Sequence, residues 1–592
     1  MRPPATNHTK LCDITVPTVF ANQSRSMQLS DSLYNRFEEV SGAYAKDIYA
    51  LRESQDDADA IGFGEQLIRF GYLDRDTTGG ILASEMGRTY VNLGKTLCQQ
   101  ELLNRVTGEI ARKLGAIPLY RMGSKATVGM SNPVDEKAIQ SLEALLGTAV
   151  SPMFCFRDEV ESAIDVNYQN VAKLDTLIQG IDLTPFQQAD LSEKRLRELI
   201  DGPQLVQFAD QLILLALKYR ASDIHIEPKR TDMVVRFRID GEMIERMRLP
   251  IALALPLASR YKVISMLDIT DRRRPQDGRF VFPLPSKKID IRVSTLPTIC
   301  GEKLVMRVLG SLYGNSMLNI DKINLSPAVA APLKRAVQKA NGMLLVTGPT
   351  GSGKTTTLYA TMNFINRPGI NVVTIEEPVE YEIPSINQIQ VDDKAGRSFQ
   401  AVLRSVLRQD PDVVLVGETR DAETARIATQ AALTGHLVLT TLHTSNALQA
   451  STRLIDMGVE RYMLAPSLLG VLNQRLVRRL CEICKTDYQP NPEYLRQFFR
   501  WNKDFNLPPL YRGEGCEHCE KTGFHGRIGI HEFLQVTPKL RDALMRGAGY
   551  DELRDIAVKE GFKEMRYDGL KKALRGLTTI DEVIKSTTTE FE

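Results

Sequence analysis

The sequence predicts a multidomain α/β protein, and three observations support that prediction. Met343–Val346 form an apolar run, a glycine-rich loop follows at Gly348–Gly353, and the next residues are expected to form a helix. Strand, phosphate-binding loop and helix follow one another in this order in nucleotide-binding proteins. From about Pro327 onward, short β-branched runs alternate with helical segments, which is typical of a parallel sheet covered on both faces. Residues 196–309 instead alternate with a period of two around a hairpin turn at Asp240-Gly241, which predicts an antiparallel sheet.

Composition is that of a globular protein. The chain has 592 residues, 43% hydrophobic and 25% charged, with a formal net charge of +2. This balance gives no overall basic field for nucleic acid. The most apolar run, Ile251–Ala258, is far shorter than a membrane-spanning helix, and the first residues lack the apolar core of a signal peptide. We therefore expect a cytoplasmic protein without a transmembrane segment, whose membrane contacts are made through partners.

Residues 1–175 are predicted to form an N-terminal α/β domain, of which 1–50 are partly flexible. Its expected elements are helices over Leu33–Tyr49, Asp135–Leu146 and Glu159–Tyr168, and strands over Tyr120–Met130 and Val150–Phe156. The polar stretch 176–194 contains Gly180 and Pro185 and is expected to be a linker.

Residues 195–312 are predicted to form a second α/β domain, in which Met233–Ile239 reads as an alternating strand. Arg236 and Arg238 are two residues apart on this strand and therefore share a face. One interpretation is a solvated basic face. The other is an arginine that neutralises transition-state charge on a phosphoryl group. A further basic cluster follows in the sequence at Arg272, Arg273, Arg274 and Arg279.

Residues 313–475 are predicted to form a nucleotide-binding domain. Lys354 would reach the β- and γ-phosphates, and the Thr355 hydroxyl would bind Mg²⁺, while backbone N–H groups of the loop wrap the phosphates. The expected nucleotide-binding residues are Gly348, Pro349, Thr350, Gly351, Ser352, Gly353, Lys354, Thr355 and Thr356.

Two predicted strands of this domain end in acidic residues, at Glu376 and Glu418. Open α/β sheets bind ligands at this end of their strands, so one carboxylate could serve the metal and the other the attacking water. His436 and His443 flank a third strand. They are either structural histidines or residues that contact or sense the γ-phosphate.

Residues 476–592 are predicted to contain a metal site followed by helices. Cys481 and Cys484 form one C-x₂-C pair, and Cys516 and Cys519 form another. Two such pairs suit a tetrahedral Cys₄ zinc site with no open ligand position, which is structural rather than catalytic. His518 lies between the last two cysteines and is a less favoured alternative ligand.

Taken together, these motifs resemble the secretion ATPase superfamily, specifically the type II secretion and type IV pilus assembly ATPases. The resembling segments are ASDIHIEP at 221–228, VRFRIDG at 235–241, RRPQDGR at 273–279, GPTGSGKTTTLY at 348–359, TIEEPVEY at 374–381, LRQDPDVVLVGETRDAETA at 407–425 and GHLVLTTLHTSNA at 435–447, together with the four cysteines.

The resemblance implies a RecA-like ATPase core, a preceding PAS-like domain, an N-terminal docking domain and a zinc insert. It implies ATP and Mg²⁺ as cofactors with structural Zn²⁺, a homo-oligomer that is a hexameric ring, and an inner-membrane platform as partner. The implied site roles are a Walker A pair at Lys354 and Thr355, a Walker B residue and Mg²⁺ ligand at Glu418, a general base at Glu376, a His box at His436 and His443, and nucleotide-facing arginines at Arg236 and Arg238. Glu377 stands where the family usually has aspartate.

The N-terminal sequence also resembles the family's docking domain, in which some relatives carry tandem motifs that bind cyclic di-GMP. Here Phe63 and Leu93 head two similar stretches, but Gly62 and Asn92 occupy the positions of the motif arginines, and Glu101 replaces a glycine in the second stretch. We therefore do not expect this second messenger to bind.

The resulting hypothesis is a cytoplasmic ATPase motor, peripheral to the inner membrane, that drives pilus or pseudopilus assembly and moves its domains about a linker near Leu309–Leu325. A nucleic-acid translocase with the same core is the first alternative, and it would require DNA-stimulated, salt-sensitive hydrolysis. A non-hydrolysing scaffold is the second. It would lack acidic residues such as Glu376 and Glu418, which are present.

Overall fold

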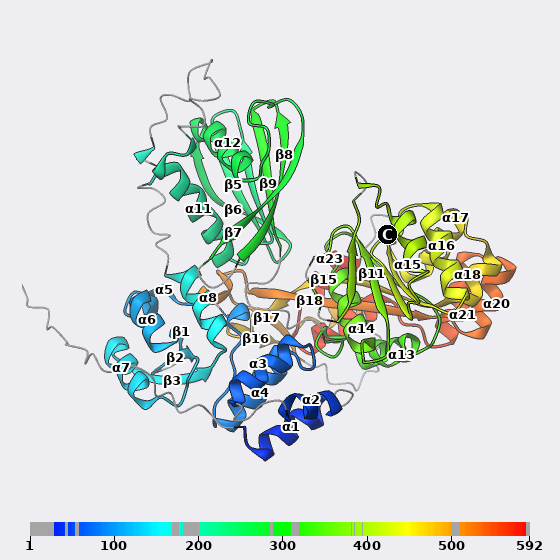
Figure 1. Ribbon diagram of the computed structural model, residues 1–592, viewed down its shortest axis with the longest axis horizontal. Coiled ribbons are helices and arrows are strands. Elements are labelled where there is room, and N and C mark those ends of the chain that lie inside the picture. Colours follow the sequence, from blue (N-terminus) through cyan, green and yellow to red (C-terminus); the bar gives the residue numbers. More distant parts are fainter. Residues whose placement is uncertain are drawn as a thin grey trace, which may run out of the picture.

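The structure is a computed structural model (Figure 1). It describes residues 29–41, 45–53, 59–96, 98–122, 124–168, 177–178, 180–181, 200–284, 288–309, 319–380, 382–383, 385–392, 395–498 and 509–587. Most of the expected linker at 176–194 and most of the expected hinge therefore lie outside the described residues. Among those that are described, no helix is long and apolar enough to span a bilayer.

The N-terminal region has a helical part and an α/β part. The helical part consists of α1 (Asp31–Ser41), α2 (Ala45–Glu53), α3 (Ala60–Arg69) and α4 (Arg75–Glu85). The second part contains η2 (Leu93–Lys95), α5 (Gln100–Leu103), α6 (Gly108–Leu114), β1 (Ala116–Met122), β2 (Lys125–Met130), α7 (Glu136–Leu146), β3 (Ala149–Phe154) and α8 (Arg157–Asn167). β1 and β2 pair antiparallel, and β2 and β3 pair parallel. The two similar stretches differ in structure, because Phe63 lies in an α-helix and Leu93 begins a 3₁₀ turn.

The second domain is a six-stranded antiparallel sheet in the order β6-β5-β4-β9-β8-β7. Its elements are α11 (Pro203–Lys218), β4 (Asp223–Pro228), β5 (Asp232–Ile239), β6 (Glu242–Pro250), η5 (Ile251–Leu253), α12 (Ala254–Ile264), β7 (Gln276–Pro283), β8 (Lys288–Thr298) and β9 (Gly301–Leu309). The apolar side chains of α11 and α12 and alternate residues of the sheet form one core. The expected turn at Asp240-Gly241 is confirmed, with positive φ angles at both residues.

The nucleotide-binding domain is a seven-stranded sheet in the order β12-β11-β13-β14-β10-β15-β18. Its elements up to β15 are α13 (Pro327–Val337), β10 (Gly342–Thr347), α14 (Lys354–Ile365), β11 (Val372–Glu376), β12 (Asn387–Gln390), α15 (Phe399–Val406), β13 (Val413–Val416), α16 (Ala422–Leu433), β14 (Leu437–Leu442), α17 (Ala447–Asp456), α18 (Arg461–Ser467) and β15 (Leu468–Leu480). Met343 and Leu345 enter the core on one face, and Leu344 and Val346 enter the other. Burial on both faces explains why β10 reads as a continuous apolar run.

The C-terminal region does not begin where the sequence placed it. Its elements are β16 (Lys485–Tyr488), α19 (Pro492–Arg496), β17 (Leu510–Gly513), η7 (Glu517–Cys519), β18 (Phe524–Gln535), α20 (Pro538–Arg546), α21 (Tyr550–Lys559), α22 (Met565–Leu574) and α23 (Ile580–Thr587). The expected boundary at 475/476 falls inside β15, which pairs parallel with β10 and antiparallel with β18. The cysteine segment is therefore an excursion between two strands of the nucleotide-binding sheet.

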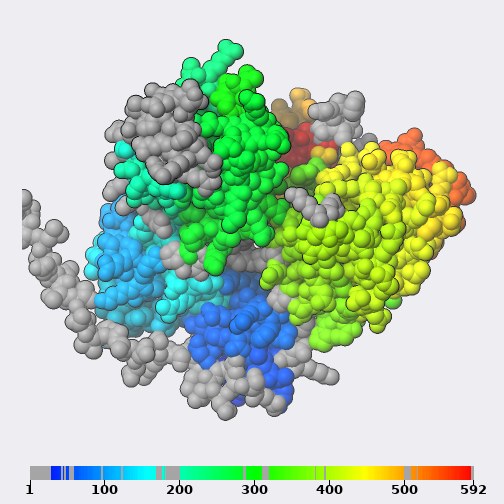
Figure 2. All heavy atoms as spheres, turned by 45° about the horizontal axis from the view of Figure 1, so that its top comes forward, coloured from blue at the N-terminus to red at the C-terminus, as the bar shows by residue number. Residues whose placement is uncertain are grey.

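Regions that are distant in the sequence touch one another within the chain. Asp74, at the start of α4, pairs with Lys322 just before α13 at 3.0 Å. On the other side, the second domain meets the C-terminal region, where Lys585 pairs with Glu242 at 2.6 Å. Figure 2 shows the green second domain above the blue N-terminal helices and beside the yellow-green nucleotide-binding domain.

Candidate active site

The glycine-rich loop lies between β10 and α14, as expected. Gly348, Gly351 and Gly353 have φ angles of +142°, +77° and +88°. Such backbone is reached readily only by glycine. The Lys354 ammonium donates to the carbonyl oxygens of Gly348 and Pro349 at 3.0 and 3.1 Å. Burial lowers the pKa of Lys354, and the nearby charge of Glu418 opposes that shift.

Parallel pairing brings four strand ends to one edge of the sheet. Thr347 is opposite Leu442, and Ile375 is opposite Val416. The residues that follow these strands are therefore neighbours: the phosphate-binding loop after β10, Glu376 at the end of β11, Glu418 after β13 and His443 after β14. This is the edge at which open α/β sheets bind ligands.

Glu376 is buried and accepts three hydrogen bonds. The donors are the Tyr359 hydroxyl, the Thr374 hydroxyl at 2.6 Å and the Gln388 amide at 3.2 Å. Its carboxylate is therefore held in a fixed orientation, and because two carboxylate oxygens offer about four acceptor positions, the three bonds leave room for one further donor. The neighbouring Glu377 is exposed and pairs with Arg420 at 2.9 Å.

Glu418 and His443 are in contact, with the His443 Nε2 atom 3.1 Å from a Glu418 oxygen. Arg420 pairs with the other carboxylate oxygen of Glu418 at 2.9 Å. Burial would raise the pKa of Glu418, but the hydrogen bond from Arg420 and the charges of Arg420, His443 and Lys354 outweigh it and bring the pKa below its ordinary value. The arrangement favours a carboxylate that carries charge beside the phosphate-binding loop.

The two histidines grouped by the sequence are separated by the fold. His436 precedes β14, and its carbonyl accepts a bond from Gly342 at the start of β10. It therefore lies at the amino edge of the sheet, a strand length away from the loop. Its Nδ1 atom is 3.0 Å from the Ala431 carbonyl. Within this chain His436 has the surroundings of the structural alternative, whereas His443 lies at the candidate site.

Arg236 and Arg238 lie on β5 in the second domain, and both are paired with carboxylates of the adjacent strand β4. Arg236 donates to Glu227 at 2.6 Å, and Arg238 lies 3.6 Å from Asp223. Glu227 also pairs with Lys229 and Lys303. These hydrogen bonds outweigh the effect of burial, which alone would raise the pKa of Glu227, and bring it to about 2.

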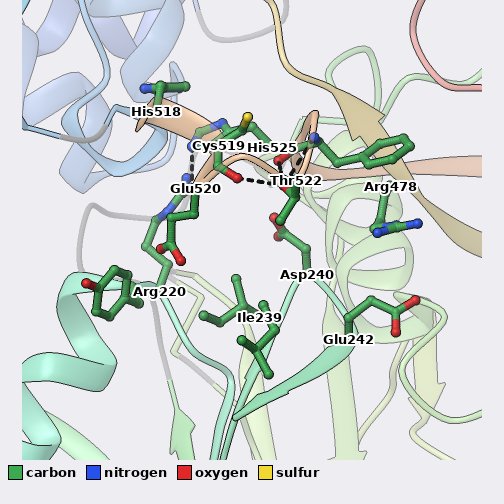
Figure 3. A pocket seen from close by; sticks show the side chains of 13 residues that line it. Arg220, Ile239, Asp240, Glu242, Arg478, His518, Cys519, Glu520, Thr522 and His525 are labelled. Atoms are coloured by element: carbon green, nitrogen blue, oxygen red, sulfur yellow. Dashed lines mark hydrogen bonds between the residues drawn. The ribbon is translucent and has the colours of Figure 1, made fainter. Parts of the chain in front are cut away.

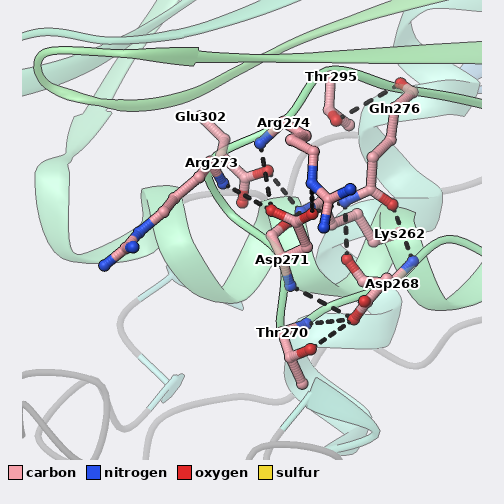
Figure 4. Close-up of polar contacts among 9 residues, drawn as sticks. All are labelled: Lys262, Asp268, Thr270, Asp271, Arg273, Arg274, Gln276, Thr295 and Glu302. Carbon is pink, nitrogen blue, oxygen red and sulfur yellow. Dashed lines mark hydrogen bonds and ion pairs between the residues drawn. The ribbon is translucent and has the colours of Figure 1, made fainter.

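The second basic cluster is displayed by a tightly bonded loop between α12 and β7 (Figure 4). The Asp271 carboxylate accepts from the backbone N–H groups of Arg273 and Arg274 at 2.9 and 3.1 Å. Beneath the loop, the buried Lys262 donates to the Asp271 carbonyl at 2.8 Å and pairs with Glu302. The side chains of Arg272, Arg273 and Arg274 are exposed.

The four cysteines converge, as the sequence predicted. The sulfur atoms of Cys481 and Cys516, of Cys484 and Cys519, and of Cys516 and Cys519 lie 3.8, 3.7 and 3.8 Å apart. A tetrahedron with metal–sulfur bonds of about 2.3 Å has edges of about 3.8 Å, so the donor set fits Zn²⁺. Backbone N–H groups of Gly515, Cys516 and Gly523 donate to the sulfurs of Cys484 and Cys519. His518 is not part of this group.

The cysteine module rests on the second domain around a small pocket (Figure 3). Arg246 pairs with Glu520, and Asp240 accepts a bond from the backbone N–H of Gly526 at 2.8 Å. The rings of His518 and His525 lie 4.1 Å apart, and Arg220 contacts His525. Burial and then Arg220 lower the pKa of His518 to about 4.

Sequence reasoning missed three side chains at the site: Tyr359, Arg420 and Gln474. Tyr359 and Arg420 lie inside quoted motifs, but nothing in their spacing showed that they bond to Glu376 and Glu418. Gln474 donates to the Ser352 carbonyl of the loop at 2.7 Å. The available signal was the polar pair Asn473-Gln474, which ends the apolar first half of β15.

Comparison with known families gives two matches. Residues 198–585 match the sequence model described as "Type II/IV secretion system protein", and residues 86–173 match the MshEN domain. The first match spans both the second domain and the nucleotide-binding domain with its cysteine module.

Several curated proteins are similar over most of this chain. The type IV pilus assembly ATPase PilB of Myxococcus xanthus is 36% identical over 91% of this chain and 96% of its own length. The type II secretion system protein E of Xanthomonas campestris is 38% identical over 92% of this chain and 96% of its own length. The PilB of Thermus thermophilus is 38% identical over 88% of this chain, which spans only 59% of that relative.

Proposed function

The chain belongs to the type II/IV secretion system protein family, and we propose that it is an ATPase motor that powers assembly of a type IV pilus or of a type II secretion pseudopilus. The observation that carries the proposal is the single sheet edge at which the phosphate-binding loop, Glu376, Glu418 and His443 meet. Relatives named for pilus assembly and relatives named for type II secretion have nearly the same sequence identity to this chain, 36% and 38%, so the proposal names both filaments.

In this proposal Lys354 leaves the loop carbonyls and neutralises the β- and γ-phosphates. Thr355 and Glu418 would hold Mg²⁺, which would supply positive charge that stabilises the transferring phosphoryl group. Glu376, oriented by its three donors, accepts the proton of the attacking water, and His443 orients the Glu418 carboxylate. Arg236 and Arg238 supply positive charge from the second domain, either of the same chain or of a neighbouring one in a hexameric ring.

The proposal also includes a structural zinc ion and a location for the protein in the cell. Cys481, Cys484, Cys516 and Cys519 would hold one structural Zn²⁺, which fixes the excursion between β15 and β18. Metal analysis of the purified chain should give close to one zinc per chain, and much less would remove this part of the proposal. The ring would lie in the cytoplasm at an inner-membrane platform to which the N-terminal domain docks, and cyclic di-GMP is not expected to bind.

The test is ATP turnover of the full chain and of its Lys354→Ala variant, each with and without DNA. We expect turnover that is independent of DNA and falls by about 10²–10³ in the variant, because a charge-stabilising donor is lost. Unimpaired turnover in Lys354→Ala would overturn the site. Turnover that requires DNA and falls steeply with salt would favour a nucleic-acid translocase, an alternative that the similar proteins do not support.

A further inference from the structure

We infer that Gln474 of β15 is a positioning residue that holds the phosphate-binding loop in its nucleotide-binding shape; the inference rests on the proposed ATPase function. Gln474 comes from the strand that follows the nucleotide-binding motifs in the sequence, and β15 lies directly beside β10 in the sheet. Its side chain is 2% exposed, so its amide is committed to protein partners.

Both ends of the Gln474 amide bond to the structure around the loop. Its Nε2 atom donates to the Ser352 carbonyl at 2.7 Å, and its Oε1 atom accepts from the Thr357 hydroxyl at 2.8 Å. The first bond reaches the loop, and the second reaches the first turn of α14. One side chain therefore fixes the loop relative to the helix whose N-terminus would face the phosphates.

The bond to Ser352 also determines where the next N–H group points. A trans peptide is planar, and its C=O and N–H point in opposite directions. Because the Ser352 carbonyl is turned toward β15, the N–H of Gly353 is turned away from β15, and backbone N–H groups of such a loop are the ones that cradle phosphates. A loop that lost this bond could rotate the peptide and present a carbonyl oxygen to an anion.

The loop is packed closely enough on β15 for this bond to be specific. A Cβ atom at Gly348 would lie 2.4 Å from the Gln474 carbonyl oxygen, and one at Gly353 would lie 3.2 Å from its Nε2 atom. The approach of β15 therefore excludes a side chain at Gly348 and leaves little room for one at Gly353, in addition to the positive φ angles at both residues.

The neighbouring residue makes the support rigid. Asn473 is buried, accepts a bond from the Thr347 hydroxyl at 3.2 Å, and donates to the Ser445 carbonyl and to Glu532, each at 3.0 Å. Glu532 in turn accepts from the Met565 N–H at 2.9 Å, at the start of α22. The strand under the loop is thus anchored on both sides, and Gln474 has little freedom to follow a loop that moves.

The test measures nucleotide affinity in the full chain, with a fluorescent ADP analogue, for Gln474→Met and for two valine variants on the same helix. Thr357→Val removes the hydroxyl that bonds Gln474. Thr361→Val is the matched control, because its buried hydroxyl donates to the Thr357 carbonyl at 2.7 Å and not to Gln474. We expect the Kd to rise about tenfold in Gln474→Met and about threefold in Thr357→Val, and to stay unchanged in Thr361→Val.

A purely structural role for Gln474 predicts a different pattern. It would lower the midpoint of thermal unfolding and the active fraction while leaving the Kd of the folded protein unchanged, and that result would overturn the inference. Equal effects of Thr357→Val and Thr361→Val would do the same. The double variant Gln474→Met/Thr357→Val should bind no more weakly than Gln474→Met alone. If the wild-type chain binds no nucleotide, the proposed function itself fails, and the two failures are therefore distinguishable.

Discussion

The carboxyl edge of the nucleotide-binding sheet and the β4–β5 face of the second domain both carry charged residues that sequence motifs singled out, but they are in different states. At the edge, Lys354, Glu418 and His443 lie beside one another around the loop. On the β4–β5 face, Arg236 and Arg238 are paired with carboxylates of their own domain. One half of the candidate site is assembled within the chain, and the charges of the other half are already neutralised.

Under the proposed function, Arg236 and Arg238 would have to exchange their carboxylate partners for a phosphate in order to act at the site. An arginine that leaves Glu227 for a phosphate exchanges one charged hydrogen bond for another, so its net contribution is smaller than that of an unpaired arginine. Glu227 itself keeps Lys229 and Lys303 as partners after such an exchange. If the domains of the proposed motor move, such an exchange would limit the cost of separating and rejoining the two regions.

The largest effect on ATP turnover is expected at the carboxyl edge of the nucleotide-binding sheet. Glu418→Gln should lower ATP turnover by about a hundredfold, because it removes the charge that would hold Mg²⁺ beside the loop. Glu377→Gln is the matched control, since this exposed carboxylate pairs only with Arg420 among the described residues, and it should change turnover by less than about twofold. Similar losses in both variants would contradict the assignment of the edge.

A smaller effect on turnover is expected at the β4–β5 face of the second domain. Arg236→Gln should lower turnover by about tenfold. The variant loses one charged hydrogen bond to the phosphoryl group, but it also no longer has to break the ion pair between Arg236 and Glu227. Arg248→Gln removes an arginine from the adjacent strand β6, where it pairs with Asp232 and Glu245, and it should leave turnover unchanged. A loss in Arg248→Gln equal to that in Arg236→Gln would indicate a general charge effect and not a specific contact.

The smallest effect concerns stability. Glu227→Gln should lower the free energy of opening of β4 and β5 by about 2 kcal/mol at pH 7, measured by amide hydrogen exchange. The folded-state pKa of Glu227 is about 2, below its ordinary value, so its contribution is present above about pH 4.5 and is lost as the pH falls toward 2. The difference between wild type and variant should shrink accordingly over that range.

The control for stability is Glu245→Gln on β6. This carboxylate is 46% exposed and pairs with Arg248, so its removal should cost less than about 0.5 kcal/mol. If the loss of opening free energy in Glu227→Gln did not depend on pH, or if Glu245→Gln caused an equal loss, the ion pairs of Glu227 would not be what stabilises the β4–β5 face.

Local sequence patterns predicted much of this arrangement. The apolar run before Gly348 and the acidic residues after short β-branched strands placed the loop, Glu376 and Glu418 at one edge, because parallel strands end together. The cysteine pairs likewise predicted the Cys₄ cluster. These features are encoded within a few residues of each other or in strands of one sheet.

What the sequence could not give depended on long-range pairing. The first half of β15 is apolar and its second half is basic, so its sequence does not predict one continuous strand, and the predicted domain boundary at 475/476 falls inside it. His436 and His443 flank one strand, but a strand of six residues places its two ends at opposite edges of the sheet, so closeness in sequence does not bring the two histidines to one site. Neither the bond from Gln474 to Ser352 nor the pairing of Arg236 with Glu227 has a sequence signature.

If the nucleotide-binding edge and the β4–β5 face act on one phosphoryl-transfer site, a double-variant cycle on ATP turnover will detect coupling between them. We compare Glu418→Gln, Arg236→Gln and the double variant in the full chain. If both side chains stabilise one transition state, the double variant should be about as slow as Glu418→Gln alone, since effects of residues that act as a unit do not multiply. A loss in the double variant equal to the product of the two single losses would contradict action of the two regions on one site.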